Sequence, residues 1–199
     1  ERTRELANEK AKVEALAMQD ALTGLPNRRV FEDRLERNFV RSRREEGPHY
    51  AVAFVDVDNF KLINDSLGHR CGDQVIAEVG RRLQQCVRAG DTVARFGGDE
   101  FTLLLCGLKK IGDADVVFHR ILDIFKDSVE VDGQRVFVTL SIGAALSDPT
   151  YAKPDNLIRD ADTALYRAKA NGKGRFELFH REMHETARKR FEMESDLRD

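Results

Sequence analysis

Acidic residues stand at two places where the sequence predicts that a strand ends. Asp56 closes the most apolar stretch of the chain, residues 50–57, and a carboxylate in such surroundings is costly unless it is paired, protonated or bound to a cation. Asp99 and Glu100 come directly after two glycines, which let the backbone approach a ligand closely. If the two strands are neighbours, these carboxylates converge on a site for a hard cation such as Mg²⁺, which substrate phosphates often complete. A helix-capping Asp and a solvated acidic hairpin are the alternatives.

Groups suited to phosphate occur at two further places. Asn59, Phe60 and Lys61 begin an expected helix, whose free backbone N–H groups and positive dipole end can hold phosphate oxygens. Lys169 and Lys173 lie near the end of the last expected core helix and would add positive charge for a triphosphate. Taken singly, either lysine is more simply explained as a solvated surface residue.

Asn64 and Asp73 flank an expected turn between two helices. A carboxylate accepts hydrogen bonds from the N1–H and N2–H₂ groups of guanine, which adenine lacks, and an amide both donates and accepts. The pair can therefore select guanine. An exposed helical Asn and a helix-capping Asp explain the same residues without a ligand.

The charge balance excludes several classes of partner. Lys and Arg number 33 against 35 Asp and Glu, which gives a net charge of -2, and 41% of the residues are hydrophobic. A folded domain is expected, without bulk attraction to nucleic acid or anionic lipid. The three cysteines are odd in number and lack zinc-ligand spacing, and no apolar run approaches the roughly 18 residues of a membrane helix. We expect a cytoplasmic chain with reduced thiols.

Hydrophobic periodicity predicts the elements that must position these residues. The strand at 50–57 is apolar throughout, which is typical of a central strand buried on both faces. The order of elements predicts an α/β (α+β) sandwich, with one mostly antiparallel sheet flanked by helices. We expect helices at about 4–18, 27–44, 59–67, 73–87, 114–125, 156–170 and 181–197, and strands at about 50–57, 92–96, 101–106, 129–131, 134–146 and 175–178.

Local signals suggest how two of these elements begin. Asp58 is expected to cap the helix at 59–67, and Leu67 is expected on the core face of that helix. A two-glycine turn at 97–98 is expected to join the hairpin that carries the second acidic cluster.

Five motifs in a fixed order identify a resemblance to the GGDEF, or diguanylate cyclase, family along nearly the whole expected core. A single five-letter match can arise by chance, whereas five in order make a false match very rare. The motifs are Asp20-x-Leu-Thr-Gly-Leu-Pro-Asn-Arg29, Phe54-x-Asp-x-Asp-x-Phe-Lys61-x-x-Asn64-Asp65, Gly68-His69-x-x-Gly72-Asp73, Arg95-Phe-Gly-Gly-Asp-Glu-Phe101 and Ala164-Leu-Tyr-x-Ala-Lys169-x-x-Gly172.

The resemblance implies a fold like the palm of nucleotidyl cyclases and polymerases, and condensation of two GTP molecules into cyclic di-GMP with release of pyrophosphate. Asp56 and Asp99, helped by the Val57 carbonyl, match the family's ligands for Mg²⁺ (or Mn²⁺). Glu100 matches the acid that assists deprotonation of the attacking 3′-hydroxyl. The positions that match GTP-binding residues are Asn59, Phe60, Lys61, Asn64, His69, Asp73, Lys169 and Lys173.

Two further properties are implied by the resemblance. One domain holds half of the product, so catalysis requires a homodimer in which two GTP molecules meet in antiparallel orientation. Arg88 and Asp91 match the family's R-x-x-D inhibitory site for cyclic di-GMP at its usual spacing. A helix-terminal Arg and a turn Asp are the alternative for this pair.

The sequence departs from the family pattern at two positions. Asp99 stands where many members have Glu, which shortens the reach to a metal, and Gly174 stands where Asn or Asp is frequent. Neither change argues for an inactive site.

The ends of the chain suggest a piece of a larger signalling protein. We expect a linker helix at 1–19, a catalytic domain at 20–179 and a connector helix at 180–199 that resembles the one leading to an EAL phosphodiesterase domain. Sensory and EAL domains would be covalent partners, and regions beyond this chain could anchor the whole protein to a membrane. The alternative function is a GTP-binding module that controls an attached EAL phosphodiesterase, while Asn64 and Asp73 disfavour an ATP-using cyclase.

Overall fold

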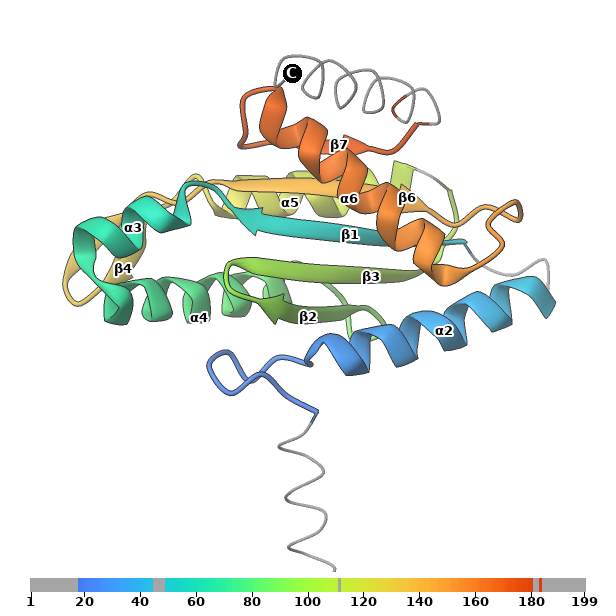
Figure 1. Ribbon diagram of the computed structural model, residues 1–199, viewed down its shortest axis with the longest axis horizontal. Helices are drawn as coiled ribbons and strands as arrows, with labels where there is room; N and C mark the ends of the chain where they lie inside the picture. The colour runs from blue at the N-terminus through green and yellow to red at the C-terminus, as the bar shows by residue number, and fades with distance from the viewer. Residues whose placement is uncertain (1–17, 45–48, 111, 181–182, 184–199) are drawn as a thin grey trace, which may run out of the picture.

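A five-stranded sheet organises the protein in the computed structural model, which describes residues 18–44, 49–110, 112–180 and 183 (Figure 1). The strand order is β2-β3-β1-β6-β7, and every neighbouring pair is antiparallel except β6 with β7. The strands of this sheet are β1 His49–Val57, β2 Thr92–Gly97, β3 Glu100–Leu108, β6 Leu140–Leu146 and β7 Phe176–Leu178. A separate antiparallel pair is formed by β4 Val129–Val131 and β5 Gln134–Val136.

Helices cover both faces of the sheet. One face packs against α4 and α5, and the opposite face packs against α2 and α6, while α3 follows β1 and lies beside α4. This arrangement confirms the predicted sandwich with a mostly antiparallel sheet. The helices are α2 Arg28–Arg44, α3 Phe60–Leu67, α4 His69–Gln85, α5 Gly112–Ile124 and α6 Pro154–Ala170.

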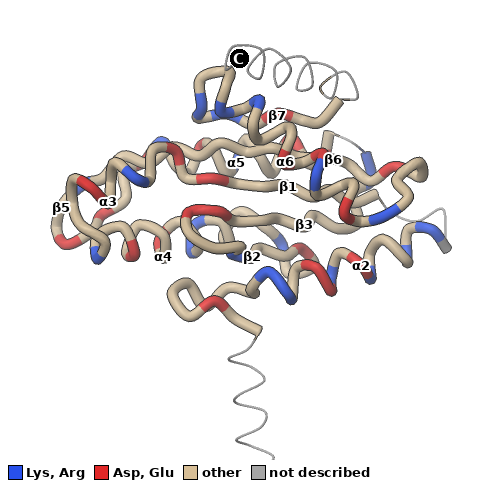
Figure 2. Tube along the Cα trace, viewed as in Figure 1, with Lys and Arg blue, Asp and Glu red and all other residues tan. Residues whose placement is uncertain are grey.

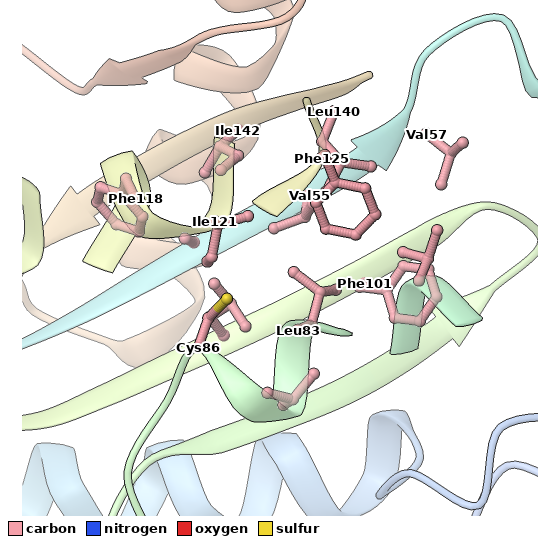
Figure 3. Close-up of a cluster of buried hydrophobic side chains, with 14 of the residues drawn as sticks. Val55, Val57, Leu83, Cys86, Phe101, Phe118, Ile121, Phe125, Leu140 and Ile142 are labelled. Carbon is pink, nitrogen blue, oxygen red and sulfur yellow. The ribbon is translucent and has the colours of Figure 1, made fainter. Parts of the chain in front are cut away.

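The two faces of β1 enter two different hydrophobic clusters because successive side chains of a strand point in opposite directions. Val55 and Val57 join the larger cluster, in which side chains from β1, β3, β6, α4 and α5 meet (Figure 3). Val52 and Phe54 join the smaller cluster under α2 and α6. The apolar character of β1 is thus explained by burial on both faces, and Asp56 continues the α2 and α6 side of the strand.

The close contact between α6 and β6 depends on Gly143. A Cβ atom at this position would lie 1.8 Å from the backbone nitrogen of Leu165, so only glycine lets the helix sit directly on the strand. Gly143 pairs with Phe54 of β1. The C-terminal turn of α6, which carries Lys169, is thereby held over the end of β1.

Several local predictions were wrong. Asp58 does not cap α3. The N-cap residue of α3 is Asn59, whose backbone has a left-handed conformation and whose side chain makes no capping hydrogen bond. Leu67 is 42% exposed and does not lie in the core, which half-buried residues of the same helix contact instead. The second helix begins at His69 instead of residue 73, because the turn between α3 and α4 is completed by Gly68 alone.

The long strand predicted at 134–146 is divided in two. Residues 137–139 leave strand geometry, so β5 pairs with β4 and β6 pairs with β1. The exposed and buried side chains still alternate through this break, which is why the sequence pattern did not reveal it.

The predicted helices at 4–18 and 181–197 fall almost wholly outside the described residues. No helix in the described ranges combines the length and apolar character needed to cross a membrane.

Candidate active site

The two acidic clusters meet at one end of the central strand pair. Asp56 of β1 lies directly opposite Glu100 of β3, so their side chains leave the sheet on the same face with Cβ atoms about 4.5–5.5 Å apart. The backbone N–H of Val57 donates to the carbonyl of Asp99 at 3.3 Å, which ties the end of β1 to the hairpin. Figure 2 shows acidic segments at both places, one beside the other. The structure therefore brings the predicted carboxylates together.

The hairpin turn is shifted by one residue from its predicted position. Gly97 pairs with Glu100, so the central residues of the turn are Gly98 and Asp99. Gly98 is the first central residue of this two-residue turn and has a φ of 52°. Hairpin turns of this length require a positive φ at that position, which favours glycine. Asp99 therefore lies at the tip of the turn, half-buried, whereas Glu100 is exposed.

Asp56 is a nearly buried carboxylate that forms an ion pair with a lysine side chain. Its side chain is 9% exposed, and its Oδ2 lies 2.6 Å from Nζ of Lys169, whose side chain is 37% exposed. Burial raises the pKa of Asp56 above its usual value, while the hydrogen bond and charge of Lys169 lower it and the charge of Asp99 raises it further. The site therefore favours a bound positive charge.

Asp58 is also buried, but the chain itself satisfies it. Its Oδ1 accepts a hydrogen bond from the Ser141 hydroxyl at 2.6 Å, and its Oδ2 accepts from the Thr139 hydroxyl at 2.8 Å and from the Gly174 N–H at 3.0 Å. These bonds join the end of β1 to β6 and to the turn after α6. The role of Asp58 is thus to position the loop that follows Asp56, a role that only the fold reveals.

The predicted phosphate-binding groups surround this loop. Nζ of Lys173 donates to Oδ1 of Asn59 at 2.7 Å, which draws the turn after α6 over the start of α3. Lys61 is exposed and Phe60 is half-buried on the first turn of that helix. With Lys169 on Asp56, the structure brings both predicted lysines to the start of α3.

The predicted guanine-binding residues lie on the facing helices α3 and α4. A Cβ atom at Gly72 would lie 1.9 Å from Oδ1 of Asn64, so the Asn64 amide rests directly on the backbone of α4 next to Asp73. Asp73 and His69 are exposed within the first two turns of α4, and Asn64 is half-buried. Asp73 lies inside the helix, which excludes the alternative role of N-cap.

An ion pair that the sequence did not predict supports the hairpin. The Arg95 guanidinium donates to both carboxylate oxygens of Asp20 at 3.0 Å and to the carbonyl of Gly98 at 2.7 Å. Asp20 also accepts hydrogen bonds from the N–H and hydroxyl of Thr23. The first and fourth motifs are therefore two halves of one support. Their spacing of 75 positions gave no sign of this contact.

Arg88 and Asp91 lie away from the carboxylates, on a turn after α4. The Asp91 side chain is 4% exposed and accepts from the backbone N–H groups of Arg88 and Cys106. Arg88 is 62% exposed, contacts the carbonyls of Cys106 and Gly107, and borders a cavity of about 320 Å³. The sequence did not predict the other two cations of this cavity, Lys109 and Arg120, because their positions depend on β3 and α5.

The protein groups fit a divalent cation that a ligand completes. No cluster of three or more His, Cys, Asp or Glu side chains in the part of the chain that the structure describes is arranged to hold a metal alone. Mg²⁺ is commonly bound by one or two carboxylates together with substrate phosphates. The donor set of Asp56 and Asp99 beside two lysines matches that chemistry.

A mixed sheet between helices, with carboxylates at the end of its central strand and at the adjoining hairpin, defines an α+β, palm-like fold. The family model described as "Diguanylate cyclase, GGDEF domain" matches residues 17–175. The chain therefore belongs to the family of GGDEF domains.

Similar proteins come from Pseudomonas aeruginosa. The diguanylate cyclase TpbB is 41% identical over 170 residues, which cover 85% of this chain and 39% of TpbB. The bifunctional diguanylate cyclase/cyclic di-GMP phosphodiesterase MucR is 36% identical over 92% of this chain and 26% of MucR. A solved GGDEF domain of TpbB has a TM-score of 0.82 and 37% identity, covering 85% of this chain and 99% of that one. The chain thus spans less than half of either full-length relative.

Proposed function

We propose that this chain is a diguanylate cyclase that condenses two GTP molecules into cyclic di-GMP and releases pyrophosphate. The observation that carries the proposal is the meeting of Asp56, Asp99 and Glu100 at the end of β1. The identity to TpbB, named as a diguanylate cyclase, supports the same activity.

The three carboxylates have different roles in phosphoryl transfer. Asp56 and Asp99, with the Val57 carbonyl, would hold Mg²⁺ or Mn²⁺, which when bound lowers the pKa of the attacking hydroxyl and neutralises charge on the leaving pyrophosphate. Glu100 assists removal of the proton from the 3′-hydroxyl, since it is exposed on the same face as Asp56.

The start of α3 and the turn after α6 hold the triphosphate. The backbone N–H groups of Asn59, Phe60 and Lys61 lie at the positive end of α3, where they have no intrahelical acceptor. Lys169 and Lys173 supply the positive charges of this cradle.

Guanine is selected between α3 and α4. Asn64 and Asp73 present an amide and a carboxylate from adjacent positions on the two helices, and His69 borders the same surface. A carboxylate that accepts from N1–H and N2–H₂ of guanine would face no equivalent donors on adenine. Asp73→Asn should therefore reduce discrimination between GTP and ATP.

Catalysis requires a second copy of the chain. One site holds one GTP, so the 3′-hydroxyl of each nucleotide must come from a facing copy in a homodimer. A domain that consumes GTP is expected to work in the cytoplasm, even if other parts of the full-length protein anchor it to a membrane.

Arg88 forms a product-inhibition site together with the cavity beside it. Its exposed guanidinium can bind phosphate and guanine in a bidentate manner. Lys109 and Arg120 add positive charge to the same cavity. Asp91 contributes by fixing the turn, because both of its oxygens already accept backbone N–H groups.

The alternative is a GTP-binding regulatory module that controls an attached EAL phosphodiesterase. The similarity to MucR, named as a bifunctional cyclase and phosphodiesterase, supports such a context. The complete set of acids favours the active enzyme over this alternative.

Incubation of the chain with GTP and Mg²⁺ or Mn²⁺, followed by chromatography of the products, tests the proposal. We expect cyclic di-GMP and pyrophosphate, with a rate that rises more than linearly with protein concentration. Bound GTP without cyclic di-GMP at high protein concentration would support the regulatory module instead.

A further inference from the structure

The pair formed by Lys169 and Asp56 places one lysine on a predicted metal ligand. Their 2.6 Å contact joins a carboxylate that is 9% exposed to an ammonium that is 37% exposed. Among the described residues, Lys169 is the one side chain that forms an ion pair with Asp56. The carboxylate is thus neutralised from within the chain.

Lys169 and a metal ion cannot both bind Oδ2 of Asp56. A divalent cation bound to Asp56 needs carboxylate oxygens at about 2.0–2.1 Å, and it would repel an ammonium held on the same oxygen. The long, flexible stem of a lysine lets its charge move while the helix stays fixed. The buried residues Leu165 and Ala168 hold this turn of α6 against the sheet.

Two neighbouring charged groups, Asp58 and Lys173, have uncharged partners instead. Asp58 accepts two hydroxyls and one backbone N–H, none of which carries a charge that could be exchanged. Lys173 donates to the Asn59 amide and so has no carboxylate to release. Of Asp56, Asp58 and Lys173, only Asp56 forms an ion pair with a cation that a metal ion could replace.

We propose that Lys169 is an exchangeable counter-ion, which neutralises Asp56 before a metal binds and then moves from this carboxylate to the nucleotide phosphates. The inference rests on the proposed function for the identity of the nucleotide. Metal alone must displace the lysine into water, whereas metal with a triphosphate gives it a new anionic partner. Metal and nucleotide therefore strengthen each other's binding by the same factor.

Binding of Mn²⁺ to the 199-residue chain without nucleotide tests the exchange. Free Mn²⁺ is measured by electron paramagnetic resonance for the wild type, Lys169→Met and Lys173→Met. We expect Lys169→Met to bind Mn²⁺ about tenfold more tightly, the effect of one charged hydrogen bond. Lys173→Met removes the same charge without freeing Asp56, so its affinity should change by less than about twofold. Equal affinities for wild type and Lys169→Met, or equal gains in both variants, would overturn the proposal.

The Asp56→Asn background shows whether the effect passes through this carboxylate. In that background Lys169→Met should give no gain in Mn²⁺ affinity, and a persisting gain would contradict the exchange. With a GTP analogue that carries a methylene group between the α- and β-phosphates, Mn²⁺ should strengthen nucleotide binding in the wild type and much less in Lys169→Met.

Nuclear magnetic resonance of the wild-type lysine side chains answers the question even if Lys169→Met folds poorly. Lys169→Arg identifies the Lys169 signal by its loss. The signal should shift with saturating Mg²⁺ and shift again with the analogue, and a signal that stays constant in both titrations rejects the exchange. Cyclic di-GMP synthesis is measured separately, so failure of the exchange is distinguished from failure of the proposed function.

Discussion

The catalytic end of β1 and the turn at Arg88 each contain a buried aspartate, but the two carboxylates have different partners. Asp91 accepts two backbone N–H groups, which the fold holds in place, and its ion pair with Arg88 at 3.6 Å adds to them. Asp56 instead pairs with the Lys169 ammonium at 2.6 Å, and a lysine side chain can move away while the helix stays fixed. The difference indicates that a carboxylate satisfied by backbone has a positioning role, whereas one satisfied by a mobile charge is ready for a ligand. Asp58 belongs to the first kind although it lies two residues from Asp56.

The largest effect is expected when the ligand-ready carboxylate is neutralised. Asp56→Asn should lower turnover by more than about a hundredfold, the upper range for disturbing groups around a metal ligand. The chain should remain folded, because no neutral hydrogen-bond donor loses its acceptor. Steady-state synthesis of cyclic di-GMP and circular dichroism measure the two properties. Asp99→Glu, which keeps a carboxylate, is the control, and wild-type turnover by Asp56→Asn would show that the metal site is wrong.

A large loss of stability is expected when Asp58 is removed. Asp58→Ala leaves the buried Ser141 hydroxyl and two further donors without their acceptor, which should cost about 3 kcal/mol of unfolding free energy. Urea unfolding measures this cost. Asp65→Ala on the exposed side of α3 is the control and should change stability by less than about 0.5 kcal/mol. If both variants were equally stable, Asp58 would not have the positioning role that distinguishes it from Asp56.

Variants at the turn that contains Arg88 should distinguish a residue that positions the turn from one that binds the ligand. Asp91→Ala should cost about 2 kcal/mol, because the N–H groups of Arg88 and Cys106 lose their acceptor. Arg88→Ala should cost about 1 kcal/mol, less than Asp91→Ala, because its exposed guanidinium contacts two carbonyls and Asp91, but it should raise the cyclic di-GMP concentration for half-inhibition about tenfold. Unfolding curves and inhibition curves on the same samples provide both values. Unchanged inhibition in Arg88→Ala would remove the product site.

The smallest effect is expected at the hairpin support. Burial by itself would raise the pKa of Asp20, but the hydrogen bonds from Thr23 and the Arg95 guanidinium outweigh it and hold this pKa below its usual 3.8. The ionised group therefore stabilises the fold above its unfolded-state pKa, and this contribution is lost as pH falls through the lower folded-state pKa.

Asp20→Asn should accordingly cost about 1 kcal/mol at pH 7 and less below about pH 4. Unfolding free energies across this pH range measure the difference between variant and wild type. Asp33→Asn, which loses an exposed ion pair with Arg37, should show little effect at either pH. A difference at Asp20 that grew as pH fell would contradict the assigned role.

Much of the fold was predictable because its signals are local. The apolar run of β1, the glycines of the hairpin and the helical periods of α4 and α6 each depend on residues close in sequence. The errors fall where a distant contact decides the outcome. Asp58 resembles a helix cap in sequence but bonds to Thr139 and Ser141, and the strand at 134–146 divides because β5 pairs with β4.

The sequence by itself determined the family, the acids at the ends of two strands and the lysines near the end of the last helix. These can be recognised from residue types at fixed spacing, which do not depend on distant contacts. The tertiary structure alone decided which partner each group has. Pairing of β1 with β3 sets Asp56 opposite Glu100, and the contact of α6 at Gly143 brings Lys169 to Asp56. Hydrogen bonds and ion pairs require atoms within a few ångströms, and residues 113 positions apart reach that distance only when the sheet and its helices are assembled.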